Sequence, residues 1–157
     1  MSYTLGAGSR RALAGVHPRL VAVVERAIVL TGQDFAVHDG LRSEAEQREN
    51  VRRGVSKTMA SKHMVQADGY GHAVDLVPWI NGALRWEWKP IFEIARAMRV
   101  AAAEARLPLI WGGVWDRALL DIAPDAAAME TAVNSYVARR RALGKTAFID
   151  GPHFELA

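Results

Sequence analysis

Hydrophobic residues recur at helical spacing in three stretches of the chain. A repeat of i, i+3, i+4 and i+7 is typical of a helix with one buried face. The first helix is predicted to begin at His17-Pro18 and to end at Thr31-Gly32, the second to begin at Pro90, and the third to run from Pro124 to Gly144. The apolar positions are, in order, Leu20, Val23, Val24, Ala27 and Ile28; Ile91, Ile94, Ala95, Met98, Ala102 and Ala105; and Met129, Val133, Tyr136 and Val137.

Four shorter runs have the composition of strands. They are residues 34–38, which end at Asp39-Gly40, residues 73–77, which we expect Pro78 to close, residues 109–111 and residues 146–149. An Asn81-Gly82 pair predicts a tight turn between extended segments.

A polar helix is predicted between the first two strands. Ser43 with Glu46 has the form of a capping box, so a helix should begin there and continue to about Arg53, where Gly54 stops it. Residues 55–72 show no periodicity and form a long irregular segment, of the kind that is often functional in a compact protein. Helices and short strands that do not alternate strictly indicate an α+β fold with a small antiparallel sheet. The length of 157 residues predicts a single domain, residues 1–157.

Composition removes several classes of function. Because the chain has no cysteine, thiolate metal sites, disulfides and cysteine nucleophiles are excluded, and any metal must be bound by His, Asp or Glu. No glycine-rich nucleotide loop and no Gly-x-Ser-x-Gly elbow is present. The net charge of +3 and the pI near 9.6 suggest attraction to anionic surfaces, or simply a basic domain.

One carboxylate stands inside an apolar strand and needs a partner. Burying Asp75 without a cation or several donors is costly, so a metal or an arginine is expected beside it. Side chains alternate along a strand, and His72 therefore points away from Asp75. His63 lies in the preceding loop and is able to reach Asp75, although a lone loop histidine is more often a surface residue.

A second group of polar residues lies near the C-terminus. Gly151-Pro152 forces a turn between Asp150 and His153, so both side chains are able to face one point. With His63 and Asp75, His153 completes two imidazoles and one carboxylate, the ligand count of a catalytic zinc ion with one open position. Asp150 is the candidate general base, and Glu155, on the same strand face as His153, is a candidate to orient it. The alternative interpretation is that this segment is a C-terminal strand whose acidic residues have no role in a site.

These motifs resemble the zinc D-Ala-D-Ala carboxypeptidase and L-alanyl-D-glutamate peptidase family, in its phage endolysin branch. The resemblance rests on Ser-x-His, Gly-x-Ala-x-Asp and a late Asp-x-x-His, and on Gly40-Leu41-Arg42-Ser43 and Trp111-Gly112-Gly113. It implies a small antiparallel sheet flanked by helices, of the Hedgehog/DD-peptidase type. It also implies site roles for seven residues: His63, Asp75 and His153 as Zn2+ ligands, Asp150 as base, Arg42 as a stabiliser of the oxyanion, and Ser61 and Asp116 in substrate binding.

Two features depart from that family. Seven residues, Met64 to Tyr70, separate His63 from Gly71, where relatives have a shorter spacer, and we interpret them as a loop insertion. Relatives often carry an acid directly after Gly-Gly, whereas this chain has Val114-Trp115-Asp116. Asp116 is therefore expected to replace that acid, or the contact is lost.

The resemblance also suggests substrate and biology. An Asp before the last ligand favours the L-alanyl-D-glutamate branch, which cleaves the first peptide bond of the peptidoglycan stem. A D-Ala-D-Ala carboxypeptidase and a non-catalytic zinc-containing wall-binding domain remain the alternatives. The chain shows neither a signal peptide nor an apolar membrane span, which together with the resemblance suggests a phage endolysin. We expect it to be a monomer. It would be made in the host bacterial cytoplasm, reach the wall after holin-type release, and bind an anionic wall or outer-membrane surface, with no nucleic-acid partner.

Trp86 and Trp88 follow the Asn-Gly turn and either flank a glycan or peptide groove or pack in the interior.

Overall fold

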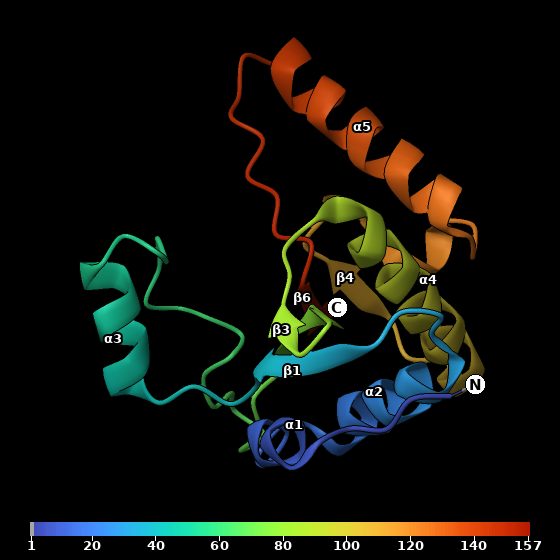
Figure 1. The fold of residues 1–157 in the computed structure, drawn as a ribbon. Coiled ribbons are helices and arrows are strands. Elements are labelled where there is room, and N and C mark those ends of the chain that lie inside the picture. The colour runs from blue at the N-terminus through green and yellow to red at the C-terminus, as the bar shows by residue number, and fades with distance from the viewer. Residues whose placement is uncertain (1) are drawn as a thin grey trace.

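The computed structural model describes residues 2–157 (Figure 1). Within this range the helices and strands follow one another in a non-alternating order, as expected for an α+β protein. In chain order they are α1 (Ala7–Ala12), α2 (Pro18–Leu30), β1 (Phe35–Asp39), α3 (Glu44–Arg52), β2 (Ala73–Ile80), β3 (Ala83–Leu84), α4 (Trp88–Ala105), β4 (Leu109–Trp111), β5 (Val114–Ala118), the 3-10 turn η1 (Leu119–Asp121), α5 (Ala126–Ala142) and β6 (His153–Leu156).

The strands form one antiparallel sheet in the order β1-β2-β6-β4-β5, with β3 paired to the far end of β2. The C-terminal strand β6 therefore lies between β2 and β4. Its register places His153 opposite Asp75 and Phe154 opposite Val74. Because paired residues share a face, the two motifs that lie 78 residues apart in sequence meet on one side of the sheet.

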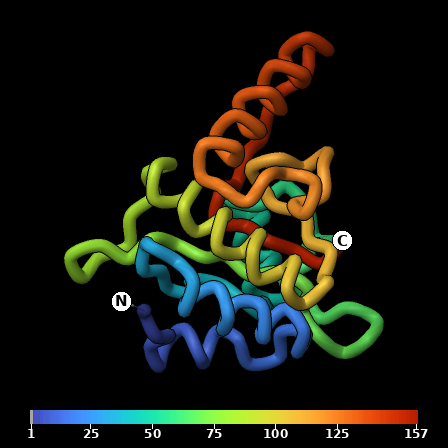
Figure 2. The backbone as a smooth tube through the Cα atoms, turned by 90° about the vertical axis from the view of Figure 1, so that its right-hand side faces the viewer, coloured from blue at the N-terminus to red at the C-terminus, as the bar shows by residue number. Residues whose placement is uncertain are grey.

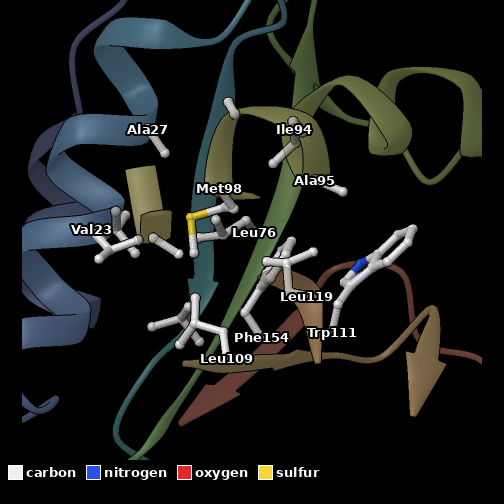
Figure 3. Packing of buried hydrophobic residues seen from close by; sticks show 14 of the residues in the cluster. Val23, Ala27, Leu76, Ile94, Ala95, Met98, Leu109, Trp111, Leu119 and Phe154 are labelled. Carbon is white, nitrogen blue, oxygen red and sulfur yellow. The ribbon is translucent and has the colours of Figure 1, made fainter. Parts of the chain in front are cut away.

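The other side of the sheet carries the hydrophobic core. Side chains of α2 and α4 pack against it, and Figure 3 shows Met98 of α4 beside Leu76 of β2. Trp111 is completely buried, stacks on Phe154 and donates from Nε1 to the carbonyl of Gly151 at 2.7 Å. The core thus holds one face of β2 and β6 in place, and Asp75 and His153 lie on the opposite face.

The three apolar stripes form helices as predicted, with small shifts at their ends. Helix α4 begins at Trp88, two residues before Pro90, and Ala105 at its end is exposed. The Ser43 hydroxyl accepts the Glu46 N–H at 3.1 Å and caps α3, as the capping box predicted. Asn81 and Gly82 both have positive φ and form the β2–β3 turn.

Two strand predictions were wrong. Residues 146–149 form no strand, and the chain pairs with β2 and β4 only from His153 onward, as β6. Pro78 does not end β2, which continues to Ile80. The neighbouring Trp79 N–H donates to the carbonyl of Asp34, just before β1, so the nitrogen of Pro78 faces the other side of β2, beyond the end of β6.

Two segments extend from the body of the protein. Helix α3 and the irregular segment after it project to the left in Figure 1, and this segment returns to the sheet at β2. Helix α5 packs against α4, and Figure 2 shows its C-terminal end extending away from the other elements. No helix among residues 2–157 combines the length and apolarity needed to cross a membrane.

Candidate metal centre

Two imidazoles and one carboxylate converge on the face of the sheet opposite the core. Oδ1 of Asp75 lies 3.2 Å from Nε2 of His63 and 3.2 Å from Nδ1 of His153. One potential ligand atom from each residue lies within 4.8 Å of the other two. Both imidazoles are buried, and the carboxylate of Asp75 is 16% exposed. Residues from the loop before β2, from β2 and from β6 thus face one point.

Each imidazole is held by its second nitrogen. Nδ1 of His63 lies 2.8 Å from the carbonyl oxygen of Gly40, so it carries the proton and donates it there. Nε2 of His153 lies 2.8 Å from Oε1 of Glu155, two residues further along the same strand face. Such contacts fix the tautomer and the ring orientation of a metal-binding histidine, and they leave His63 Nε2 and His153 Nδ1 directed at Asp75.

The electrostatics of the cluster keep a proton on His153 and a charge on Asp75. Burial alone would raise the pKa of Asp75, but hydrogen bonds from His153 and His63 outweigh it and hold that pKa well below its ordinary value. Burial opposes charge on His153 too, yet Asp75 and Glu155 together raise its pKa to about 9. An imidazolium held between two carboxylates marks a site where a divalent cation would replace one proton.

The donor set fits a zinc ion. Ligand atoms about 2.0–2.1 Å from an ion in tetrahedral geometry lie about 3.3–3.4 Å from one another. The two separations of 3.2 Å to Asp75 Oδ1 agree with this spacing. Two nitrogens and one carboxylate oxygen, each already oriented by its neighbours, leave one position free for water or substrate.

Arg42 stands next to the cluster in a network of its own. Its guanidinium donates to the carboxylate of Asp39 and to the amide oxygen of Gln47, and it lies 4.0 Å from Oδ2 of Asp75. Its backbone N–H donates to the carbonyl of His63 at 2.7 Å. Gln47 is completely buried and also donates to Ser56 and Thr58, which ties α3 to the loop that carries His63. Arg42 is therefore a fixed positive charge beside the cluster rather than a solvated surface residue.

Asp150 approaches the cluster from the segment before β6. Burial and the negative charge of Asp75 raise the pKa of Asp150 to about 6, against the opposing effect of His153, His63 and Arg42. Its backbone is fixed against the Gly-Gly turn, since Asp150 N–H donates to the Gly112 carbonyl at 2.8 Å. A Cβ on Gly112 would lie 2.2 Å from the Asp150 carbonyl oxygen, so only glycine permits this approach.

The remaining candidates lie in different positions. The Ser61 hydroxyl accepts the His63 N–H at 3.1 Å and shapes the turn that presents this imidazole. Asp116 points to the helix side of β5 and pairs with Arg139 of α5 at 2.7 Å, so nothing in its contacts supports a substrate role. His72 points away from Asp75, as its strand position predicted, and its Nε2 lies 2.7 Å from Asp68.

Two neighbours of the site were missed at the sequence level. Asp39 was interpreted only as part of a turn, yet its carboxylate holds Arg42. Trp115 packs its ring against His153, with centroids 5.1 Å apart, from the face of β5 opposite to Asp116. A single Asp before glycine and one tryptophan in a polar strand carry no local signal of these contacts.

Comparisons with known proteins match the chain to one class of peptidase. A family profile described as phage L-alanyl-D-glutamate peptidase matches residues 1–125. The chain is 32% identical over 120 residues to the L-alanyl-D-glutamate peptidase of Escherichia phage T5, an alignment that covers 74% of this chain and 84% of the phage protein. The crystal structure of the Serratia marcescens L-Ala D-Glu endopeptidase ChiX matches with a TM-score of 0.70 and 36% identity, over 100% of this chain and 90% of that chain.

Proposed function

Since the chain belongs to the phage L-alanyl-D-glutamate peptidase family, we propose that it is a zinc-dependent endopeptidase that cleaves the L-Ala–D-Glu bond of the peptidoglycan stem. The observation that carries this proposal is the convergence of His63, Asp75 and His153 on one point beside Asp150 and Arg42. The names of the two relatives support the choice of bond.

In this proposal His63, Asp75 and His153 would hold the zinc ion through the atoms that face one another. When bound, zinc would supply a Lewis acid that polarises the scissile carbonyl and lowers the pKa of water. Gly40 and Glu155 keep the two imidazoles in the tautomers that binding requires. The core behind β2 and β6 keeps Asp75 and His153 in register, and the Arg42 N–H holds the backbone of His63.

Asp150 then acts as general base. A carboxylate whose pKa is raised toward neutrality holds a proton more readily than an ordinary Asp. It takes one proton from the attacking water and gives it to the amine of D-Glu as the peptide bond breaks. Arg42, fixed by Asp39 and Gln47, offsets the negative charge that develops on the carbonyl oxygen. A preorganised charge of this kind requires no rearrangement during the reaction.

The biological setting is part of the same proposal. An enzyme of this class acts on the cell wall, and we infer that it reaches the wall from the host cytoplasm through a holin-type lesion. The net charge of +3 supports binding to an anionic wall or outer-membrane surface. We propose that it acts as a monomer formed by one domain, residues 1–157.

Product analysis tests the proposed bond. Purified peptidoglycan is incubated with the protein, with protein plus chelator, and with chelated protein after zinc is restored. New free N-terminal D-Glu with intact glycan strands, lost with chelator and recovered with zinc, is the expected result. Release of free D-Ala alone would overturn the proposal in favour of a carboxypeptidase, and no release in any sample would favour a wall-binding domain.

A further inference from the structure

Two exposed tryptophans lie on the same face of the sheet as the cluster formed by His63, Asp75 and His153. Side chains alternate along β2, so Trp79 shares the face of Asp75. The β2–β3 register pairs Trp79 with Leu84, and the Arg85 N–H donates to the Pro78 carbonyl, which places Trp86 opposite Val77 on that face. At roughly 3.3 Å per residue, Trp86 lies about 7 Å and Trp79 about 13 Å along β2 from Asp75.

These tryptophans are open to solvent, unlike those of the core. Trp79 is 41% exposed and Trp86 is 55% exposed, whereas Trp111 is fully buried. The Trp86 ring meets His38 of β1 edge-on, with centroids 5.4 Å apart, so it extends across β2 toward β1. We name Trp79, Trp86 and His38 the aromatic platform.

A cavity adjoins the platform. It has a volume of about 570 Å³ and extends between α1 and the outer edge of β1. Trp79 and His38 line it together with polar groups that include Asp34 and Ser9. Flat apolar rings beside hydrogen-bonding side chains match a ligand that has both apolar faces and hydroxyl or amide groups.

We propose that the aromatic platform is a saccharide subsite that binds the glycan strand to which the stem peptide is attached. This inference rests on the proposed function. In peptidoglycan, the L-Ala before the scissile bond is joined directly to the lactyl group of a muramic acid. The L-Ala and the lactyl group each span roughly one residue length, about 3.5 Å. The first sugar ring therefore begins about 7 Å from the scissile bond.

The spacing of the platform agrees with that connection. Trp86 lies at about the distance of the first sugar, and Trp79 continues in the same direction along β2 toward the cavity. Sugar rings present apolar C–H faces that pack on aromatic rings, while their hydroxyl and N-acetyl groups hydrogen-bond with polar side chains at the rim. The enzyme would thus recognise the stem peptide and its glycan as one substrate.

Two matched substrates test the subsite. One is a soluble disaccharide-tetrapeptide, and the other is the same tetrapeptide freed from its sugar by an amidase. We expect wild type to have the higher kcat/KM on the disaccharide-tetrapeptide. Trp79→Ala and Trp86→Ala should each lower kcat/KM on it by about tenfold, the factor expected for losing one well-packed aromatic contact. The same variants should change cleavage of the sugar-free peptide by less than about twofold.

The control is Leu143→Ala, which removes an even more exposed apolar side chain, 67% accessible, at the end of α5 and should change neither rate. Equal losses on both substrates would overturn the inference, because they would show that the platform binds peptide, and so would unchanged rates on both. If wild type cleaves neither substrate, the proposed function fails, and the subsite is then tested by binding alone.

That binding test uses peptide-free glycan oligosaccharides and the intrinsic tryptophan fluorescence of the protein after chelation. A saturable change in fluorescence that disappears in the Trp79→Ala, Trp86→Ala double variant supports the subsite. No saturable change, or the same change in the double variant, overturns it. Thermal unfolding of each variant shows whether it is folded, and Trp86→Tyr, which keeps an aromatic ring, should recover part of the affinity.

Discussion

Nε2 of His153 lies 2.8 Å from Oε1 of Glu155, two residues along the same strand, so the nitrogen that faces Asp75 is Nδ1. This contact leaves Nδ1 as the nitrogen that would bind the proposed metal. We expect Glu155→Gln to lower zinc affinity by about 10–100-fold, because a neutral amide orients the imidazole less strongly than a carboxylate. Competition with a chromogenic chelator measures the change. Asp116→Asn, which alters a surface pair with Arg139, is the control and should leave affinity unchanged.

The choice between the two histidines around the inserted loop is tested by substitution. His63→Ala should abolish stoichiometric zinc binding, since His63 Nε2 is one of the three converging atoms. His72→Ala should retain it, because His72 pairs with Asp68 on another part of the surface. Metal analysis of both variants after dialysis gives the answer, and zinc retained in His63→Ala but lost in His72→Ala would show that our assignment of the loop is wrong.

Asp150 should be required for catalysis and not for metal binding. Asp150→Asn keeps the size and the backbone contact with Gly112, but it cannot accept a proton. We expect kcat to fall by about 10²–10⁴-fold, the usual contribution of a general base. Zinc content and thermal stability should stay close to those of wild type. Full activity in this variant would remove Asp150 from the mechanism.

The metal-free protein should lose stability at alkaline pH. The pKa of His153 is raised from 6.5 to about 9 in the folded state, so its stabilising effect is fully present below 6.5 and is lost as pH rises through about 9. The difference amounts to at most about 3 kcal/mol in the free energy of unfolding. Urea denaturation of chelated protein at pH 6.5 and pH 9.5 measures it. His153→Asn should flatten the profile, and an equally steep profile in this variant would assign the effect to other groups.

Gly112 is expected to position Asp150 through close packing. In Gly112→Ala the new Cβ would lie 2.2 Å from the Asp150 carbonyl oxygen, so this segment must move. Both thermal stability and activity should fall, with the loss of activity larger than that of zinc binding. Gly6→Ala is the matched control, since a Cβ there meets nothing within 4 Å. Equal thermal stability and equal activity of the two variants would contradict the role assigned to Gly112.

Features that depend on local sequence were predictable. The three long helices carry complete apolar stripes, and the alternation along β2 correctly separated Asp75 from His72. The convergence of His63, Asp75 and His153 was expected, and the structure brings them together, while their roles as zinc ligands stay a prediction.

Features that depend on distant partners were not predictable. Helix α1 contains Gly8 and has no side-chain cap, and it is held by the Ser9 hydroxyl, which accepts the Val37 N–H of β1. Residues 146–149 have the composition of a strand, but they form none, and the positions beside β2 and β4 are filled by β6. Asp116 could not be placed without knowing that α5 brings Arg139 beside it.

The central claim is that His63, Asp75 and His153 bind one zinc ion. A crystal structure of the zinc-loaded protein, with anomalous data collected at the zinc edge, tests it most directly. We predict one anomalous peak about 2.0–2.2 Å from His63 Nε2, Asp75 Oδ1 and His153 Nδ1. A peak at His72 and Asp68 instead, or no peak at the three predicted ligands, would contradict the claim.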